Sequence, residues 1–174
     1  MNASADLIPM VETDRLILRA PKRDDLPAVT AFFASAQSHT VGGPRDDLGS
    51  AMSMNATFGL WALYGYGSWF IADRDSDAYL GRTGFLMAPG WEEPELGWAG
   101  TAEAQGKGIA AEATIAARRF GAQHLGLDGV ISYIRPTNTR SAAMAKRLGA
   151  RLEKTHDNWR GAPCDVYRHP TEAA

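Results

Sequence analysis

Apolar residues recur along the chain with two periods, and the switch between them predicts the order of the secondary structure. Residues 15–20 alternate charged and apolar side chains, which is typical of a half-buried strand. Leu26, Val29 and Phe33 recur at helical spacing, and a second helical stretch covers residues 46–63 despite two glycines. The whole pattern predicts a strand, two helices, three strands, a helix, a strand, a helix and two final strands.

Most of the remaining predicted elements are short and end at glycine, proline or aspartate turns. Strands are expected at 67–72, 79–87, 95–99, 130–134, 150–155 and 164–168, and helices at 109–120 and 139–148. Residues 1–12 are expected to form an irregular lead-in and residues 40–44 a loop. The pattern predicts one α/β domain, residues 1–174, with a mixed, mostly antiparallel central sheet flanked by helices.

The stretch Gln105-Gly106-Lys107-Gly108-Ile109-Ala110 carries the strongest chemical signal in the chain. Its two glycines lead directly into a helix, so backbone N–H groups can approach a ligand at the positive end of the helix dipole. Turns of this kind often bind phosphate. Three explanations compete for this turn: a structural bend, a dinucleotide site and a site for the pyrophosphate of coenzyme A.

A dinucleotide site is the weaker of the two phosphate explanations. Residues 106–111 satisfy G-x-G-x-x-A, but that motif expects an acidic residue about 20 positions later, at the end of the next strand. Asp128 has roughly this spacing yet precedes the strand, which ends in Arg135-Pro136. The turn also follows three strands that are expected to be antiparallel.

Several motifs in a fixed order resemble the GNAT superfamily of N-acetyltransferases, and specifically its RimJ/RimL-type branch. The loop of that family is Q/R-x-x-G-x-G/A, which residues 105–110 fit. Further matching segments are the AEA of 111–113, the GLD of 126–128, the NTRS of 138–141, the RLGA of 147–150 and the ETDRLILR of 12–19. The resemblance covers nearly the whole chain and implies a sheet in which two strands splay apart at an acyl-CoA site.

The resemblance implies that acetyl-CoA is the cosubstrate. Its pyrophosphate would lie on the backbone N–H groups of residues 106–110, and its pantetheine arm between strands 95–99 and 130–134. The residues expected at the cofactor are Leu96, Gly97, Trp98, Gln105, Gly106, Lys107, Gly108, Ile109, Ala110, Asn138 and Ser141. Competing interpretations are a helix N-cap for Asn138 and a merely exposed side chain for Lys107.

Acetylation of an amine requires a proton acceptor, because a primary amine with a pKa near 10 is mostly protonated at neutral pH. Glu95 is the candidate base, since it lies on the strand beside the expected thioester. The alternatives are Glu92, Glu93, His156 and Asp157. In this branch of the family a serine at the position of Ser141 lies near the sulfur, where it could protonate the leaving thiolate. Met144 occupies the place where many GNAT enzymes carry a tyrosine.

Composition excludes several other functions. A net charge of -2 argues against general binding to nucleic acid or to anionic membranes. Cys164 is the single cysteine, and together with the four histidines it forms no metal-binding pattern, so no metal site is expected. No apolar run reaches the roughly 20 residues of a membrane span, and the first residues lack the features of a signal peptide. These observations favour a cytoplasmic protein.

The sequence therefore predicts an enzyme that moves an acetyl group from acetyl-CoA to a primary amine by direct attack in a ternary complex. The acceptor would be a protein N-terminus or a small-molecule amine, and the family resemblance allows a homodimer. The alternative from a different class is a non-catalytic module that binds or senses acyl-CoA.

Overall fold

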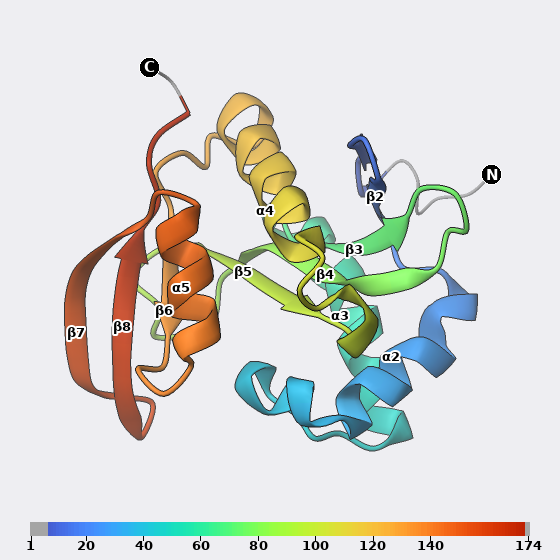
Figure 1. Ribbon diagram of the computed structural model, residues 1–174, viewed down its shortest axis with the longest axis horizontal. Coiled ribbons are helices and arrows are strands. Elements are labelled where there is room, and N and C mark those ends of the chain that lie inside the picture. Colours follow the sequence, from blue (N-terminus) through green and yellow to red (C-terminus); the bar gives the residue numbers. More distant parts are fainter. Residues whose placement is uncertain (1–6, 173–174) are drawn as a thin grey trace.

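The computed structural model describes residues 7–172, and its centre is one eight-stranded sheet (Figure 1). The strands are β1 (Val11–Glu12), β2 (Leu16–Arg19), β3 (Ser68–Asp73), β4 (Tyr79–Leu86), β5 (Glu95–Gly100), β6 (Ile131–Ile134), β7 (Arg151–Trp159) and β8 (Ala162–Arg168). Their order in the sheet is β1-β2-β3-β4-β5-β6-β8-β7, and only the β5–β6 pair is parallel. This arrangement confirms the predicted mixed, mostly antiparallel sheet.

Four α-helices and four shorter helical turns flank the sheet in the described part of the chain. The helices are α2 (Leu26–Ala34), α3 (Asp47–Tyr64), α4 (Ile109–Phe120) and α5 (Thr139–Arg147). The turns are η1 (Arg23–Asp25), η2 (Ala36–Val41), η3 (Ala102–Ala104) and η4 (Gly121–Leu125). Local chemistry sets the ends of α3, because the Asp46 carboxylate accepts a hydrogen bond from the Gly49 amide at 2.7 Å and Gly65 ends the helix at φ +72°.

Alternate residues of the strands supply cores on opposite faces of the sheet. Phe85 and Leu96 pack with Ala113 and Ala117 of α4, whereas Phe70 and Ala99 belong to a cluster with residues of α2. The close approach of the α4 end to the sheet requires a glycine, because a Cβ on Gly121 would lie 2.2 Å from the Phe85 ring. Each face of β5 is therefore covered by a different part of the chain.

Two predicted loop assignments are wrong within the described residues. Val11 and Glu12 form β1, which pairs with β2 through Val11↔Leu18 and Glu12↔Ile17. Thr40 and Val41 belong to η2, although they were expected to lie in a loop. A two-residue strand and a short 3₁₀ turn are too brief to show a periodic apolar pattern, so neither leaves a signal in the sequence. The rest of the expected lead-in, residues 1–6, lies outside the described residues.

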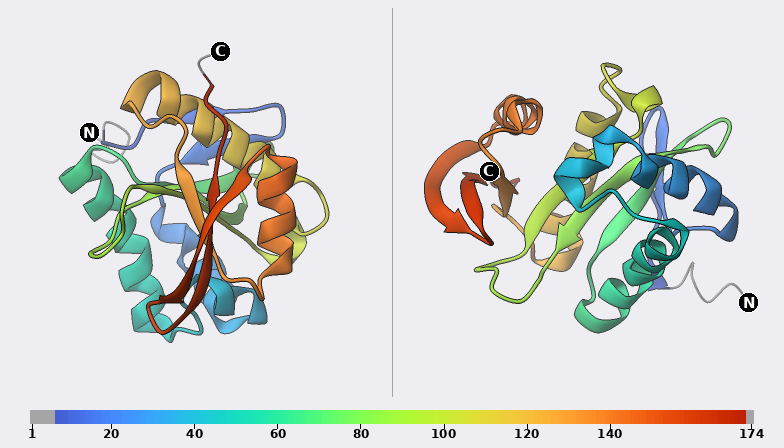
Figure 2. Two further views of the ribbon diagram at one scale, coloured as in Figure 1. Left: turned by 90° about the vertical axis from the view of Figure 1, so that its left-hand side faces the viewer. Right: turned by 90° about the horizontal axis from the view of Figure 1, so that it is seen from below.

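The sheet divides at its parallel pair. Figure 2 (right) shows β6, α5, β7 and β8 leaning away from the remaining strands, with β5 at the boundary. β8 pairs with β6 and β7 in an antiparallel arrangement, so this second part is held together by its own ladders. The division creates the wedge in which the candidate site lies.

Candidate active site

β5 and β6 separate after a single residue pair, Glu95↔Ile131. Beyond this pair, hydrogen bonds between side chains and the backbone take the place of the backbone hydrogen bonds that the separated strands cannot form. The Ser132 hydroxyl donates to the carbonyl oxygen of Leu96 at 2.5 Å, and the Tyr133 amide donates to Oε2 of Glu95 at 3.0 Å. The wedge is therefore held by specific hydrogen bonds and is not a simple gap in the ladder.

Two cavities are described, of about 560 Å³ and about 640 Å³. The larger one lies at the wedge. Its walls come from the end of β5, the glycine turn with the start of α4, the helix α5 and the turn η2. Eight of the eleven residues predicted at the cofactor line it: Trp98, Gln105, Gly106, Gly108, Ile109, Ala110, Asn138 and Ser141. Leu96, Gly97 and Lys107 do not border this cavity.

The glycine turn has the backbone conformation that only glycine adopts readily. Gly106 and Gly108 have φ values of +73° and +76°. Arg15 anchors the turn to the edge of β2, since its Nη1 donates to the Lys107 carbonyl at 3.1 Å and its Nε donates to Glu112 at 2.7 Å. Glu112, in the first turn of α4, therefore has a structural role.

Asn138 and Arg140 connect α5 to the same cavity. The Asn138 side chain caps α5 by accepting a hydrogen bond from the Ser141 amide at 3.2 Å. The guanidinium of Arg140 donates to the side-chain oxygen of Gln105 at 2.9 Å, which links α5 to the glycine turn. The N-cap role of Asn138 is therefore present, and the residue also faces the cavity.

Glu95 has the environment of a weakly ionised carboxyl group. Burial raises its pKa to about 7, and the hydrogen bond from the Tyr133 amide only partly opposes this shift. Its Oε1 lies over Gly97, because a Cβ built on that glycine would be 3.7 Å from this oxygen. Gly97 has no side chain, so space remains beside the carboxylate.

Two of the alternative carboxylates, Glu92 and Glu93, are engaged in ion pairs, and the third, Asp157, is exposed on β7. Glu92 pairs with Lys154, which lowers the pKa of Glu92, and its Oε1 lies 3.5 Å from Nε2 of His156. Glu93 forms two hydrogen bonds of 2.7 Å with Arg168. Glu92 and Glu93 are bound to cations, whereas Glu95 is the carboxyl group with a raised pKa.

Comparison with known proteins identifies the family. The family described as the acetyltransferase (GNAT) domain matches residues 15–151. The chain belongs to the GNAT acetyltransferase family. YoaA of Bacillus subtilis, an uncharacterized N-acetyltransferase, is 29% identical over 153 residues, which are 84% of this chain and 85% of YoaA. The resemblance seen in the sequence motifs is thereby confirmed.

Solved GNAT structures share the fold. An acetyltransferase from Agrobacterium tumefaciens superposes with a TM-score of 0.84 at 34% identity, covering 93% of this chain and 94% of that protein. RimL, the ribosomal L7/L12 alpha-N-protein acetyltransferase, was solved in complex with coenzyme A. It has a TM-score of 0.79 at 17% identity, covering 95% of this chain and 99% of RimL. At this identity the likeness to RimL shows a shared fold.

Ser132 and His169 form a buried pair next to the wedge, and this pair was not predicted from the sequence. The Ser132 hydroxyl lies 2.9 Å from Nε2 of His169, and burial lowers the pKa of His169 to about 4. The neutral imidazole therefore supports the serine that holds the Leu96 carbonyl. The only local sign of the pair is one polar residue inside the apolar strand 130–134.

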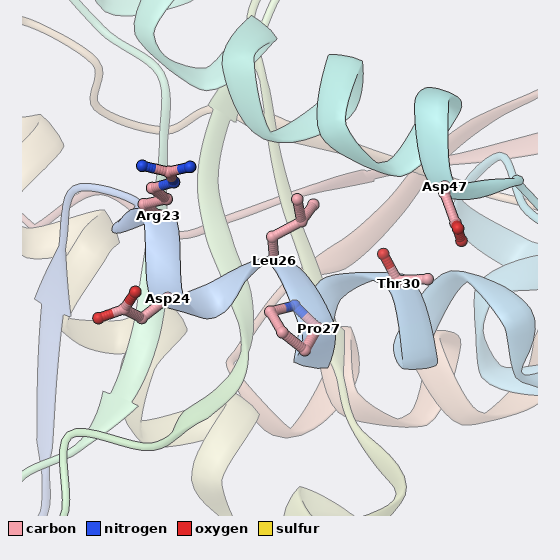
Figure 3. A pocket seen from close by; sticks show the side chains of 6 residues that line it. All are labelled: Arg23, Asp24, Leu26, Pro27, Thr30 and Asp47. Carbon is pink, nitrogen blue, oxygen red and sulfur yellow. The ribbon is translucent and has the colours of Figure 1, made fainter.

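The second hollow lies apart from the GNAT motifs, between the beginnings of α2 and α3 (Figure 3). It is lined by Arg23, Asp24, Leu26, Pro27, Thr30 and Asp47. Its charged residues lie at the surface and include none of the predicted site residues.

Other features of the described residues bear on the chemistry. No group of three His, Cys, Asp or Glu side chains among residues 7–172 is arranged to hold a metal ion. Within the same range, every helix is too short or too polar to cross a membrane. Cys164 is a buried free thiol whose pKa is raised by burial. This environment disfavours the reactive thiolate.

Proposed function

We propose that this protein transfers an acetyl group from acetyl-CoA to a primary amine, either a protein N-terminus or a small-molecule amine. The wedge between β5 and β6 carries the proposal, because Glu95, a carboxylate of raised pKa, lies where the two strands separate, and the cavity lies further along β5 at Trp98, Ala99 and Gly100. The buried thiol of Cys164 disfavours an acyl-enzyme, so the amine would attack directly in a ternary complex.

The residues at the cavity fit coenzyme A. The N–H groups of the glycine turn and the positive end of α4 suit the pyrophosphate, and Arg140 adds a cation nearby. The Leu96 carbonyl points toward β6, so the N–H of Trp98, two residues later, lies on the same open edge of β5. The pantetheine amides would pair with this edge as an added strand does. The bound cosubstrate supplies the activated acetyl thioester.

Three groups of the chain would then handle charge and protons. Glu95 accepts the proton that the attacking amine loses, and passes it to solvent. The N–H of Trp98 stabilises the negative charge that develops on the acetyl oxygen. Ser141 donates a proton to the departing sulfur from the wall of the cavity and regains one from solvent. The new N–C bond replaces the C–S bond, and free coenzyme A is released.

Thermal melting in parallel with acetyl-CoA, CoA, NADH and ATP tests the donor. A ligand at a hundredfold excess over its Kd stabilises the folded state by about 2.7 kcal/mol, and we expect this only with the two CoA compounds. Thiol release with a panel of peptides and small amines then tests transfer. Failure of CoA to raise the melting temperature would contradict the proposal, and binding without any thiol release would indicate a non-catalytic acyl-CoA module.

A further inference from the structure

Arg82 is a cation on the same face of the sheet as Glu95, and none of the carboxylates in residues 7–172 pairs with it. The register of β4 and β5 places Arg82 opposite Ala99, which borders the cavity. Its Nη1 donates to the Ser53 hydroxyl of α3 at 3.2 Å, and its Nη2 lies 3.5 Å from the carbonyl oxygen of Val41 in the cavity wall. Neutral oxygens therefore hold the guanidinium beside the site.

A second cation approaches the same place. The guanidinium carbon of Arg45 lies 4.9 Å from the centre of the Phe33 ring, and that of Arg82 lies 5.4 Å from it. Burial, and to a lesser degree the charge of Arg45, lower the pKa of Arg82. Two positive charges without a counter-ion destabilise each other, and a bound anion would relieve the repulsion.

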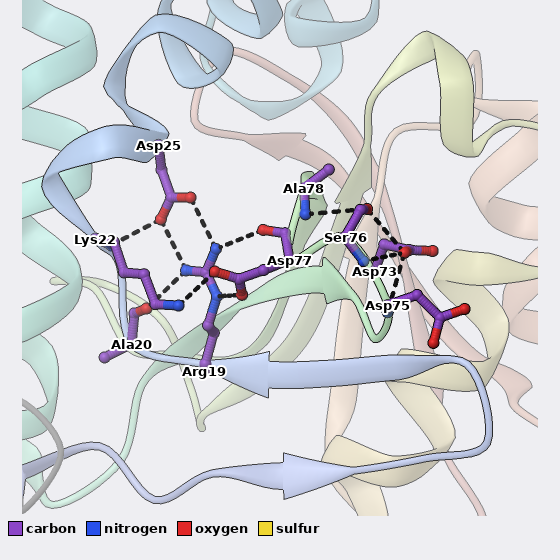
Figure 4. Close-up of polar contacts among 9 residues, drawn as sticks. All are labelled: Arg19, Ala20, Lys22, Asp25, Asp73, Asp75, Ser76, Asp77 and Ala78. Atoms are coloured by element: carbon purple, nitrogen blue, oxygen red, sulfur yellow. Dashed lines mark hydrogen bonds and ion pairs between the residues drawn. The ribbon is translucent and has the colours of Figure 1, made fainter.

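Arg19, a buried arginine, shows how this chain neutralises such a charge when the role is structural. Arg19 donates to both carboxylate oxygens of Asp25 at 2.8 Å and to Asp77 at 2.7 Å (Figure 4). Lys22 joins the network through Asp77. The network ties β2, η1 and the β3–β4 turn together. Arg82 lacks a comparable partner, so its charge is available to a ligand.

Small residues separate Arg82 from Glu95 on this face of the sheet. Across β4 and β5 the paired positions are Arg82↔Ala99, Gly84↔Gly97 and Leu86↔Glu95, so two glycines form the floor between the charged groups. Ala99 and Glu95 are four residues apart on β5, which corresponds to about 13 Å of extended strand. Long side chains shorten this span, so one small molecule or chain terminus can reach both groups.

We propose that Arg82, with Arg45 nearby, binds a carboxylate of the acceptor, so that the favoured acceptors are amines that also carry a carboxylate. The inference rests on the proposed function, because Glu95 and the wedge define where the amine must lie. A guanidinium suits this role, since its planar donors match the two oxygens of a carboxylate. The amine would lie beside Glu95 over Gly97, and the carboxylate toward Arg82.

A series of acceptors of increasing chain length tests the inference. Glycine, β-alanine, 4-aminobutyrate and 6-aminohexanoate are each compared with their carboxamides, and kcat/KM is measured by release of CoA thiol. We expect at least a tenfold preference for the carboxylate at the best chain length. A carboxylate also changes the pKa of its own amine, so the decisive quantity is the change in preference between the native protein and Arg82→Gln.

Arg82→Gln should abolish the preference for the carboxylate, and Arg45→Gln should reduce it. Arg23→Gln removes the same charge from the exposed turn η1 and should leave the preference intact. A preference absent at every chain length, or unchanged in both Arg82→Gln and Arg45→Gln, would overturn the inference. If Arg82→Gln does not fold, exposed Arg45 supplies the deciding variant.

A binding measurement separates this inference from the proposed function. The arginine Nε–H resonances of the native protein are followed by NMR during titration with 4-aminobutyrate and with its carboxamide. The resonances of Arg82 and Arg45 are assigned as those that disappear in Arg82→Gln and Arg45→Gln. If 4-aminobutyrate shifts these resonances saturably and its carboxamide does not, the anion site is supported even if no acceptor is acetylated. An equal response to both compounds, or none, contradicts the site even if acetyl-CoA binds and amines are acetylated.

Discussion

Glu95 is the residue on which the proposed chemistry most depends. Its carboxyl group has a pKa of about 7, so kcat/KM should rise with pH through this value as the base loses its proton. We expect Glu95→Gln to lower kcat/KM at pH 8 by about a hundredfold or more and to remove the inflection near pH 7. Rates measured from pH 5.5 to 8.5 test this. Glu92→Gln, at a carboxylate whose pKa is lowered, should keep the inflection. An inflection that survives in Glu95→Gln would exclude this residue as the base.

Gly97 offers a test of the space beside that carboxylate. A Cβ at this position meets only Oε1 of Glu95, at 3.7 Å, which is ordinary van der Waals contact. Gly97→Ala should therefore change the free energy of unfolding by less than about 0.5 kcal/mol. Its methyl group would occupy the place assigned to the amine and lower kcat/KM at least tenfold. Gly59→Ala, which meets open space on α3, should leave the activity unchanged. Full activity in Gly97→Ala would place the amine elsewhere.

Among the elements, the glycine turn can be tested against a matched turn far from it in sequence. Gly106 and Gly126 have similar φ values of +73° and +68°, and a Cβ on either would meet no atom within 4 Å. Alanine in this left-handed conformation should destabilise the fold by about 1–2 kcal/mol in both cases. Only Gly106→Ala should also weaken acetyl-CoA binding, at least tenfold by titration calorimetry, because it moves the N–H groups assigned to the pyrophosphate. If the two variants bound acetyl-CoA with equal affinity, the glycine turn would not be part of the binding site.

The elements that sequence could predict are those whose cause is local. Apolar spacing predicted the long helices. The glycine turn was evident because the positive φ values that it requires are supplied by two nearby glycines in the sequence. The strand β1 was missed because two residues show no period. Ser132 and His169 were missed for a different reason. They are 37 positions apart and meet only because β8 pairs with β6, which no local pattern encodes. The position of Arg82 relative to Glu95 likewise depends on the pairing of β4 with β5, which no local pattern encodes.

At the scale of the whole molecule, two groups with shifted pKa values give opposite dependences of stability on pH. Folding raises the pKa of Glu95 from 4.5 to about 7, so its contribution is fully present below about pH 4.5 and is lost as pH rises to about 7. Folding lowers the pKa of His169 from 6.5 to about 4, so its contribution is present above pH 6.5 and is lost as pH falls to about 4. Between pH 4.5 and 6.5 the two effects oppose each other and nearly cancel.

Removal of either group should expose the effect of the other. In Glu95→Gln the free energy of unfolding should rise with pH between 4.5 and 6.5, relative to the native protein, by up to about 1.4 kcal/mol per pH unit. In His169→Gln it should fall over the same range with a similar slope. Urea denaturation at half-unit pH steps and constant ionic strength measures both, with His39→Gln as the control at an exposed histidine. If the native and both variant curves ran parallel, neither group would be buried as the fold places it, and Glu95 would lose the raised pKa that makes it a base near neutrality.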